Sequence, residues 1–500
     1  MRIALLCPAL AFLLISVRMG TAQDPSFTQQ SVRQAMVSAT SFMRDQIADH
    51  GGYAYVSSAD GKYSNGEGIA GPDRIWVQPP GTPAVGMAML QAYQASGDKV
   101  HLDAAIDAGN ALVAGQLRSG GWGYSIEFDP SLRKKIPYRV GPHGGKDQIT
   151  PTPSPGGWTV WRQGKNKANK TLIDDDTTPA SIRFLAKLDQ ELGFKHQEIH
   201  DAALYALQST LNAQYPIGAW GHNYDRFQPS PPSESFYPIL RASYPKDWPR
   251  KWPNAWNGCY GLNDRITTNM IETMLLAADV YDDDRYRQSA IRGGDFLVNA
   301  QMPMPQPAWA QQYDENMHPV WERKFEPPAI TGGESQDVIA TLLKLYRETG
   351  QERFLQPIGP ALKYLRNSLR KDGQLARYYE LQTNRPLYFD KEYQLTSDDS
   401  NVPDHYGFIV ESKLEPLDRE YQRLINAGPE PKSKSLKTLA KAVAPVLAAQ
   451  RSDGAWLTPT FVRDGDGKKV TPAEGVVESA VFIKNMRVLA DWLAAAKRVR

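Results

Sequence analysis

Apolar residues recur along most of this chain at the three- and four-residue spacing of amphipathic helices. Polar stretches rich in Gly and Pro separate the periodic segments, so that neighbouring segments form helix–turn–helix pairs. The predicted helices cover Ser31–Asp49, Val85–Ser96, His101–Gln116, Ser181–Leu192, Gln197–Gln214, Asn269–Tyr281, Arg285–Gln301, Gln336–Glu348, Arg353–Ser368, Leu436–Ala449 and Glu478–Lys497. The pattern therefore predicts an all-α fold built from helical hairpins.

The ends of several predicted helices repeat one another. A helix closes on Gln, a turn containing Gly or Pro follows, and a Trp comes next. The pairs are Gln116 with Trp122, Gln214 with Trp220, Gln301 with Trp309, and Gln450 with Trp456. A weaker copy over residues 371–377 lacks the Trp. Because two helices and a loop fit between successive copies, the repeat predicts an α/α toroid, with long loops at one end lining a substrate groove.

Three long loops separate the hairpins, over residues 123–177, 302–335 and 372–410. Loops held by a rigid scaffold are the usual location of functional residues. If the turns share one end of the toroid, these loops converge on one groove. Acids of the first loop (174–176) would then lie beside arginines of the other two.

The N-terminus has the character of a secretory signal peptide. An apolar run follows Arg2 and ends at small residues around Ala22. We therefore expect residues 1–22 to be removed and a single catalytic domain to cover residues 23–500, in a secreted or periplasmic monomer. No other stretch is long and apolar enough to cross a membrane.

Charge and cysteine content narrow the function classes. Removal of residues 1–22 takes away two of the 57 basic residues and none of the 55 acidic ones, so the mature chain is neutral overall. A general nucleic-acid-binding surface is therefore not expected. Cys259 is then the single cysteine, which excludes an internal disulfide and favours a small buried residue.

Four blocks of sequence carry a family resemblance. They are IDDDTTPASIRFLAKL (173–188), NAQYPIGAW (212–220), RKFEPPAITGGES (323–335) and ARYYELQTNRP (376–386). In content and order they resemble the pectic acid lyases, the pectate lyases of polysaccharide lyase family 10. The resemblance spans about residues 120 to 410 and implies an α/α toroid that cleaves polygalacturonate by calcium-assisted β-elimination.

The resemblance also implies roles for individual residues. Asp174 corresponds to the calcium-binding and catalytic acid of that family, and Arg323 to its catalytic base. Arg377 and Arg385 fall in the family's substrate-clamping block, with Thr383 and Asn384 between them. Trp122 and Tyr406 are further candidates for contact with the substrate.

The chemistry of β-elimination explains why such residues are needed. The reaction removes the weakly acidic proton at C5 of a uronate and expels the group at C4, so negative charge develops beside the carboxylate. Calcium held by oxygen ligands can neutralise that charge, and arginines can pair with carboxylates at two points. Arginine is an awkward base because its pKa exceeds about 12, so Arg323 would need desolvation near other cations.

The chain departs from the family at the expected second acidic site. Asn269 and Met270 stand after Ile266-Thr267, where the family has acids, and Asp264 lies a few residues upstream. We therefore predict that Asp264 joins Asp174 and Asp175 in holding Ca²⁺.

Each of these residues also has a purely structural interpretation. The acids at 174–176 can stabilise a following helix N-terminus, as acids 282–284 are expected to do. Arg323 can be a surface ion-pair partner, and Arg377 and Arg385 can brace an irregular loop. The repeated tryptophans, Trp122 among them, can fill the core instead of stacking on sugars.

The sequence thus predicts an enzyme, a pectate lyase that acts on polygalacturonate or a related uronan. Two rivals stay open. An inverting glycoside hydrolase on the same fold needs two carboxylates roughly 6.5–9.5 Å apart; Glu127, Asp174, Asp264 and Glu334 are its candidates. A non-catalytic uronan-binding protein would keep the groove without forming product.

Overall fold

The computed structural model describes residues 27–140, 169–227, 230–254, 258–428 and 436–498. The predicted signal peptide lies outside these residues. In the described ranges, no helix combines the length and the apolar character that a membrane crossing requires.

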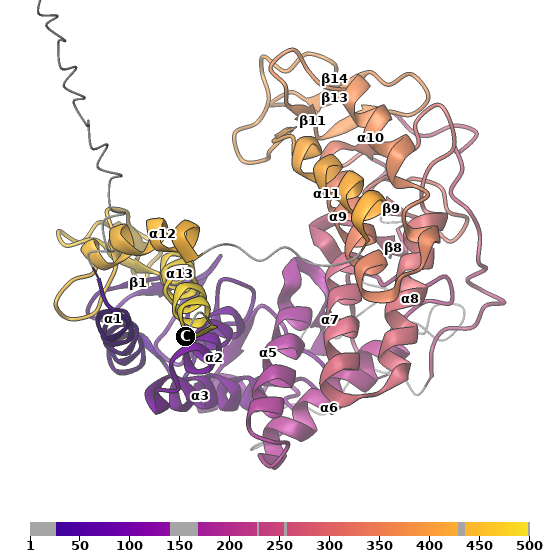
Figure 1. Ribbon diagram of the computed structural model, residues 1–500. Helices are drawn as coiled ribbons and strands as arrows, with labels where there is room; N and C mark the ends of the chain where they lie inside the picture. Colours follow the sequence, from indigo (N-terminus) through magenta and orange to yellow (C-terminus); the bar gives the residue numbers. More distant parts are fainter. Residues whose placement is uncertain (1–26, 141–168, 228–229, 255–257, 429–435, 499–500) are drawn as a thin grey trace, which may run out of the picture.

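The helices form two rows along one arc (Figure 1). The inner row is α13 (Ser479–Arg498), α2 (Thr82–Ser96), α5 (Thr177–Glu191), α7 (Ile266–Tyr281), α9 (Gly332–Thr349) and α11 (Leu414–Ala427), and each helix packs on the next. The outer row is α1 (Gln29–Phe42), α3 (Lys99–Gly115), α6 (Gln197–Asn212), α8 (Asp284–Asn299), α10 (Ile358–Asn367) and α12 (Leu436–Ala448). The fold is an α/α toroid, as the repeat predicts.

Burial distinguishes the two rows. The inner helix α7 is buried on nearly all sides, whereas its hairpin partner α8 keeps a polar, exposed face. A helix that is apolar all round belongs in a core. Asp283 caps α8 by accepting a hydrogen bond from the backbone N–H of Arg285, which confirms the capping interpretation of this acidic turn.

The repeated Gln joins one hairpin to the next. Its side-chain amide donates to a carbonyl of its own turn and to a carbonyl at the neighbouring outer-row helix. The pairs of acceptors are Gly120 and Ala202 for Gln116, Gly218 and Ser289 for Gln214, Pro307 and Pro357 for Gln301, and Gly454 and Ala35 for Gln450. The repeated Gln therefore bonds each helical hairpin to the next one around the toroid.

The repeated Trp links the outer row of helices to the inner row. Each indole N–H donates to a carbonyl of its own outer helix, Leu112, Thr210, Leu297 or Val446, at 2.7–3.0 Å. The backbone N–H of three of them donates to a hydroxyl at the start of an inner helix, Thr178, Thr267 or Ser335. Each tryptophan thus ties an outer helix to an inner one.

The first and last elements of the described residues meet. Strand β1 (Val56–Ser58) pairs antiparallel with β19 (Val476–Glu478), in a five-stranded sheet ordered β16-β19-β1-β2-β3. The C-terminal α13 packs on α2 and α1, so the first and last helices lie side by side (Figure 1).

The sequence pattern did not predict the strands. They are two to four residues long and lie in the loops: β2 (Ser64–Asn65), β3 (Ile69–Ala70), β4 (Arg74–Trp76), β5 (Ser125–Glu127), β6 (Thr171–Leu172), β7 (Asn223–Tyr224), β8 (Tyr260–Gly261), β9 (Gln312–Tyr313), β10 (Ala329–Thr331), β11 (Leu375–Ala376), β12 (Tyr378–Glu380), β13 (Pro386–Phe389), β14 (Leu395–Thr396), β15 (Ile409–Val410), β16 (Leu457–Thr458), β17 (Val462–Arg463) and β18 (Lys469–Val470). These short paired strands fix the ends of the loops. An alternating pattern of apolar and polar residues is visible only over a longer segment, so the sequence does not reveal them.

Candidate active site

The loops before α5 and α7 have the same unusual backbone. The 3₁₀ turn η4 (Asp174–Asp176) precedes α5, and η5 (Asn263–Arg265) precedes α7. Each contains two successive residues with positive φ, at 52° and 60° in η4 and at 46° and 61° in η5. Left-handed conformations are rare outside glycine, so these turns direct their side chains in a way that an ordinary helix start does not.

The two turns bring three aspartates together. Asp174, Asp175 and Asp264 offer carboxylate oxygens that all lie within 4.8 Å of one another. Asp264 therefore lies beside the other two, as predicted. Burial, together with the charge of Asp174, raises the pKa of Asp175 to about 7. The arrangement is electrostatically unfavourable unless a cation joins it.

Hydroxyl and imidazole groups surround the aspartates. The Tyr124 hydroxyl lies 3.3 Å from Asp174 and 3.2 Å from Asp175. The His222 ring has Nδ1 3.9 Å from Asp174 and Nε2 3.0 Å from the buried carboxylate of Glu322. Burial disfavours a charged ring, but Glu322 and Asp174 raise the pKa of His222 well above its usual value. A cationic His222 thus links the two acids, and Asp174 Oδ1 is buried with no hydrogen-bond partner.

A second cluster supplies the cations. Arg323 donates from Nε to Glu326 Oε2 at 2.7 Å and from a terminal nitrogen to Glu326 Oε1, and its charge lowers the pKa of Asp174. Although partial burial opposes its charge, the Glu326 carboxylate raises the pKa of Arg323 above its usual value. Arg323 is therefore a firmly protonated cation next to the aspartates.

Arg377 and Tyr406 belong to the same cluster. The Tyr406 hydroxyl donates to Glu326 at 2.9 Å, and the Arg377 guanidinium lies 4.8 Å from the centre of the Tyr406 ring. Arg377 also forms an ion pair with Glu334, in the first turn of α9, at 3.3 Å. The structure thus connects Arg323, Arg377 and Tyr406 through shared contacts.

One predicted substrate contact is corrected by the structure. The Trp122 side chain is 0% exposed and cannot stack on a sugar. Asn384 accepts from Tyr364 and donates to Ser368 at 3.0 Å, so its amide holds the β12–β13 turn against α10. The Thr383 hydroxyl donates to Glu380 in the same turn. The roles of Asn384, Thr383 and the exposed Arg385 in substrate binding stay predictions.

Sequence reasoning missed Tyr124, His222 and Glu322 as site residues. The repeat contained a signal for the first two, because each lies two residues after a repeated Trp. In the third repeat the same position is Gln311, which accepts from the Tyr378 hydroxyl at 3.1 Å. The second position after the Trp therefore faces the site in three successive repeats.

The spacing of the aspartates bears on the hydrolase rival. Carboxylate oxygens within 4.8 Å leave less separation than an inverting pair needs. Glu127 is held by Arg74, with bonds of 3.0 and 2.7 Å to Oε2, and Glu334 by Arg377. The cluster thus favours cation binding over inverting hydrolysis.

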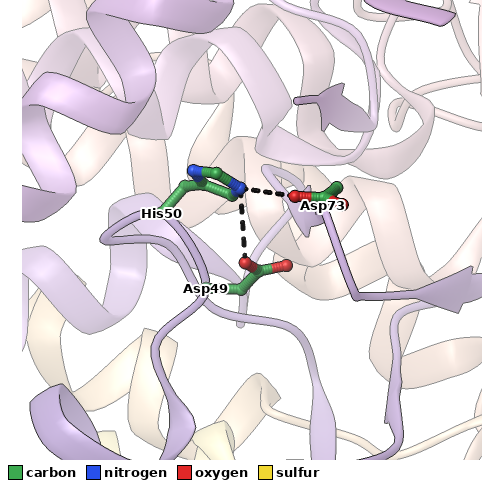
Figure 2. A group of neighbouring side chains, drawn as sticks. All are labelled: Asp49, His50 and Asp73. Atoms are coloured by element: carbon green, nitrogen blue, oxygen red, sulfur yellow. Dashed lines mark hydrogen bonds and ion pairs between the residues drawn. The ribbon is translucent and has the colours of Figure 1, made fainter. Parts of the chain in front are cut away.

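Asp49, His50 and Asp73 form a second group of potential ligands. His50 Nε2 lies 2.7 Å from Asp73 and 3.6 Å from Asp49, as Figure 2 shows. The His50 ring also stacks on Phe128, with centroids 4.3 Å apart. These contacts fasten the loops around β4, whereas Asp49 Oδ2 is buried with no hydrogen-bond partner.

A hollow of about 750 Å³ lies between η1 (Met43–Ile47), β1 and the loops around residues 451 and 474. Arg451, in its lining, forms ion pairs with Glu474 at 2.8 Å and Asp453 at 3.2 Å. Its charge is thereby balanced, and the hollow offers an acidic ligand no free cation among its described lining residues.

The sequence matches no protein-family model and no curated protein. Solved structures with similar folds include a family 10 polysaccharide lyase from Cellvibrio cellulosa in complex with trigalacturonic acid (16% identity, 69% of this chain and 98% of that one, TM-score 0.42). Others are a cellobiose 2-epimerase from Bacillus thermoamylovorans (12%, 93% and 99%, TM-score 0.46) and a family 76 α-mannanase from Bacteroides thetaiotaomicron (10%, 95% and 97%, TM-score 0.42). Likeness at this level concerns the arrangement of the helices alone.

Proposed function

We propose that this protein is a secreted enzyme that cleaves polygalacturonate or a related uronan by cation-assisted β-elimination. The observation that carries the proposal is the placement of Asp174, Asp175 and Asp264 beside Arg323. Acids that can hold a cation, next to arginines that can hold carboxylates, are what elimination from a uronate requires.

The three aspartates fit a calcium ion. Calcium prefers several carboxylate oxygens, Asp174 Oδ1 is a buried oxygen with no partner, and the three charges repel one another in its absence. When bound, the ion would supply Lewis-acid stabilisation of charge that develops at the uronate carboxylate. His222 and Tyr124 orient Asp174, which fixes where that carboxylate can lie.

The arginines bind the polymer in this proposal. Arg323 and Arg377 both lie near the Tyr406 ring, with guanidinium carbons 5.9 and 4.8 Å from its centre, so each can hold a uronate carboxylate beside it. For Arg323 to act as the base, as the resemblance implies, substrate binding has to displace Glu326. The intact pair keeps the guanidinium protonated, and this ties the proposed proton transfer to occupancy of the site.

The test is the ultraviolet absorbance of unsaturated products, measured with residues 23–500 and polygalacturonate at alkaline pH, with calcium and then with a chelator. We expect a rise in absorbance that the chelator stops. Asp174→Ala should abolish the calcium-dependent rate while the far-ultraviolet circular dichroism stays unchanged. The matched control is Asp279→Asn, an exposed acid on α7.

Other outcomes identify the rivals. Reducing ends that appear without unsaturated product would indicate hydrolysis, and binding of polygalacturonate with no product would indicate a binding protein. A fully active Asp174→Ala enzyme would remove the metal role from this residue.

A further inference from the structure

One tryptophan differs from every other tryptophan in the described part of the chain. Trp252 is 37% exposed, whereas the others in those ranges are buried, at 8% exposure or less. An exposed Trp is costly because its large apolar surface meets water. Its location therefore needs an explanation, and the folding repeat does not supply one.

The Trp252 ring is held in place. Its indole N–H donates to the backbone carbonyl of Glu322 at 3.1 Å, and in return the Trp321 indole donates to the carbonyl of Pro249 at 2.7 Å. Trp248, which lies 6.3 Å from the Trp321 ring, packs beneath the segment. Two reciprocal bonds thus fix residues 249–252 against residues 321–322 and present the Trp252 ring in one position.

That position adjoins the candidate active site. Glu322 directs its carboxylate inward to His222, the partner of Asp174, and its backbone carries Trp252 on the outside. The next residue along the chain is Arg323. Glu322 therefore connects three groups: Asp174 through His222, Arg323 as its neighbour in the chain, and the exposed Trp252 ring.

The chain segments that carry Trp252 and its partner Glu322 are basic. Arg250 and Lys251 precede Trp252, Arg323 and Lys324 follow Glu322, and all four are exposed. Arg250 lies 4.0 Å from the centre of the Trp248 ring and forms an ion pair with Glu380. A flat apolar ring among cations suits a ligand with apolar faces and acidic edges, which describes a pyranose ring that bears a carboxylate.

We infer that Trp252 is the stacking platform of a uronate subsite next to the reacting position. The inference rests on the proposed function and deepens it, because it locates where the sugar beside the cleaved bond lies. Its carboxylate would face the Arg323 side, and the ring face would cover the indole.

The experiment measures binding of trigalacturonate by isothermal titration calorimetry, in calcium, to the full mature chain and three variants. Trp252→Ala should raise Kd about tenfold, equivalent to about 1.4 kcal/mol. Trp252→Phe should stay near the wild-type Kd, because it keeps an aromatic face although it loses the five-membered ring with its N–H. Phe194→Ala, which removes another exposed ring (44% exposed), is the control and should not change Kd.

The two variants of Trp252 separate stacking from bracing. If the indole only pins the loop, Trp252→Phe loses as much affinity as Trp252→Ala, and the inference is overturned. It is also overturned if Trp252→Ala binds like the wild type. A wild-type protein that binds no trigalacturonate overturns the proposed function first, and this inference with it.

Discussion

Replacement of Asp264 by Asn tests the cation site through stability. Asn keeps the shape of the side chain and tolerates the left-handed backbone at this position, where φ is 46°. Only the charge is removed. Without calcium the variant should therefore be more stable than the wild type, and with calcium it should gain less.

The magnitude follows from the spacing of the acids. At the 4.8 Å limit between ligand oxygens, two charges repel by about 0.9 kcal/mol in water and about 3.5 kcal/mol at an effective dielectric constant near 20. Asp264 is exposed, so the lower figure applies, and its two pairs give about 2 kcal/mol. Although the residue as a whole is exposed, partial desolvation of its carboxyl group and the charge of Asp174 raise the pKa of Asp264, which has the same sign: the site disfavours this charge.

The assay is thermal unfolding in a chelator and in calcium. For a chain of this size the unfolding entropy is about 1 kcal/mol/K, so Tm in chelator should rise by roughly 2 °C. Calcium at about 100 times its Kd should stabilise the wild type by about 2.7 kcal/mol and the variant by much less. A variant that is less stable in chelator, or that keeps the full calcium shift, would refute the coupled cluster; Asp279→Asn should change neither value.

Three other changes give sharp outcomes. Arg323→Lys keeps the charge but loses the planar guanidinium that can pair with a uronate carboxylate at two points, so kcat/KM for polygalacturonate should fall at least about tenfold; a near-normal rate would remove Arg323 from the mechanism. Trp220→Phe deprives the Thr210 carbonyl of its buried indole donor and should lower the unfolding free energy, measured in urea, by about 2 kcal/mol. Unchanged stability would contradict the role of this Trp in tying an outer helix to an inner one. Burial lowers the pKa of His101 from 6.5 to about 4, so the unfolding free energy should fall by about 3 kcal/mol as pH falls from above 6.5 to below 4. Urea titrations at several pH values should show that His101→Asn removes this part of the pH dependence. An equal pH dependence in the variant would assign the loss to another group.

Much of the fold could be predicted from the sequence because the apolar spacing of a helix is a local pattern. The predicted helices begin and end within a few residues of those observed, and the spacing of the Gln–Trp pairs gave the toroid. Helix α11 was missed although Leu414, Leu417, Tyr421 and Leu424 recur at helical spacing, and of its residues only Leu414 and Leu424 are buried. The strands were missed because two to four residues are too few to show an alternating pattern of apolar and polar side chains.

The site was only partly readable. Asp174, Asp175, Asp264, Arg323 and Arg377 were named from sequence, and the toroid brings them together. The error at Trp122 has a physical reason: a Trp stands at the same place in four of the five copies of the repeat and ties two helices together at each. The positions that change between repeats, such as Tyr124, His222 and Gln311, are those that face the site.

The pairing of the chain ends has a consequence for synthesis. The Ser479 hydroxyl donates to the carbonyl of Ala54, 425 residues earlier, and α13 covers a face of α2. At roughly 5–20 residues per second, ribosomes leave that face open for about 20 to 80 seconds before its cover is made. During this interval the nascent N-terminal hairpin exposes apolar surface and an unpaired β1 edge, so a chaperone must shield it or the chain must stay unfolded until its last helix is complete.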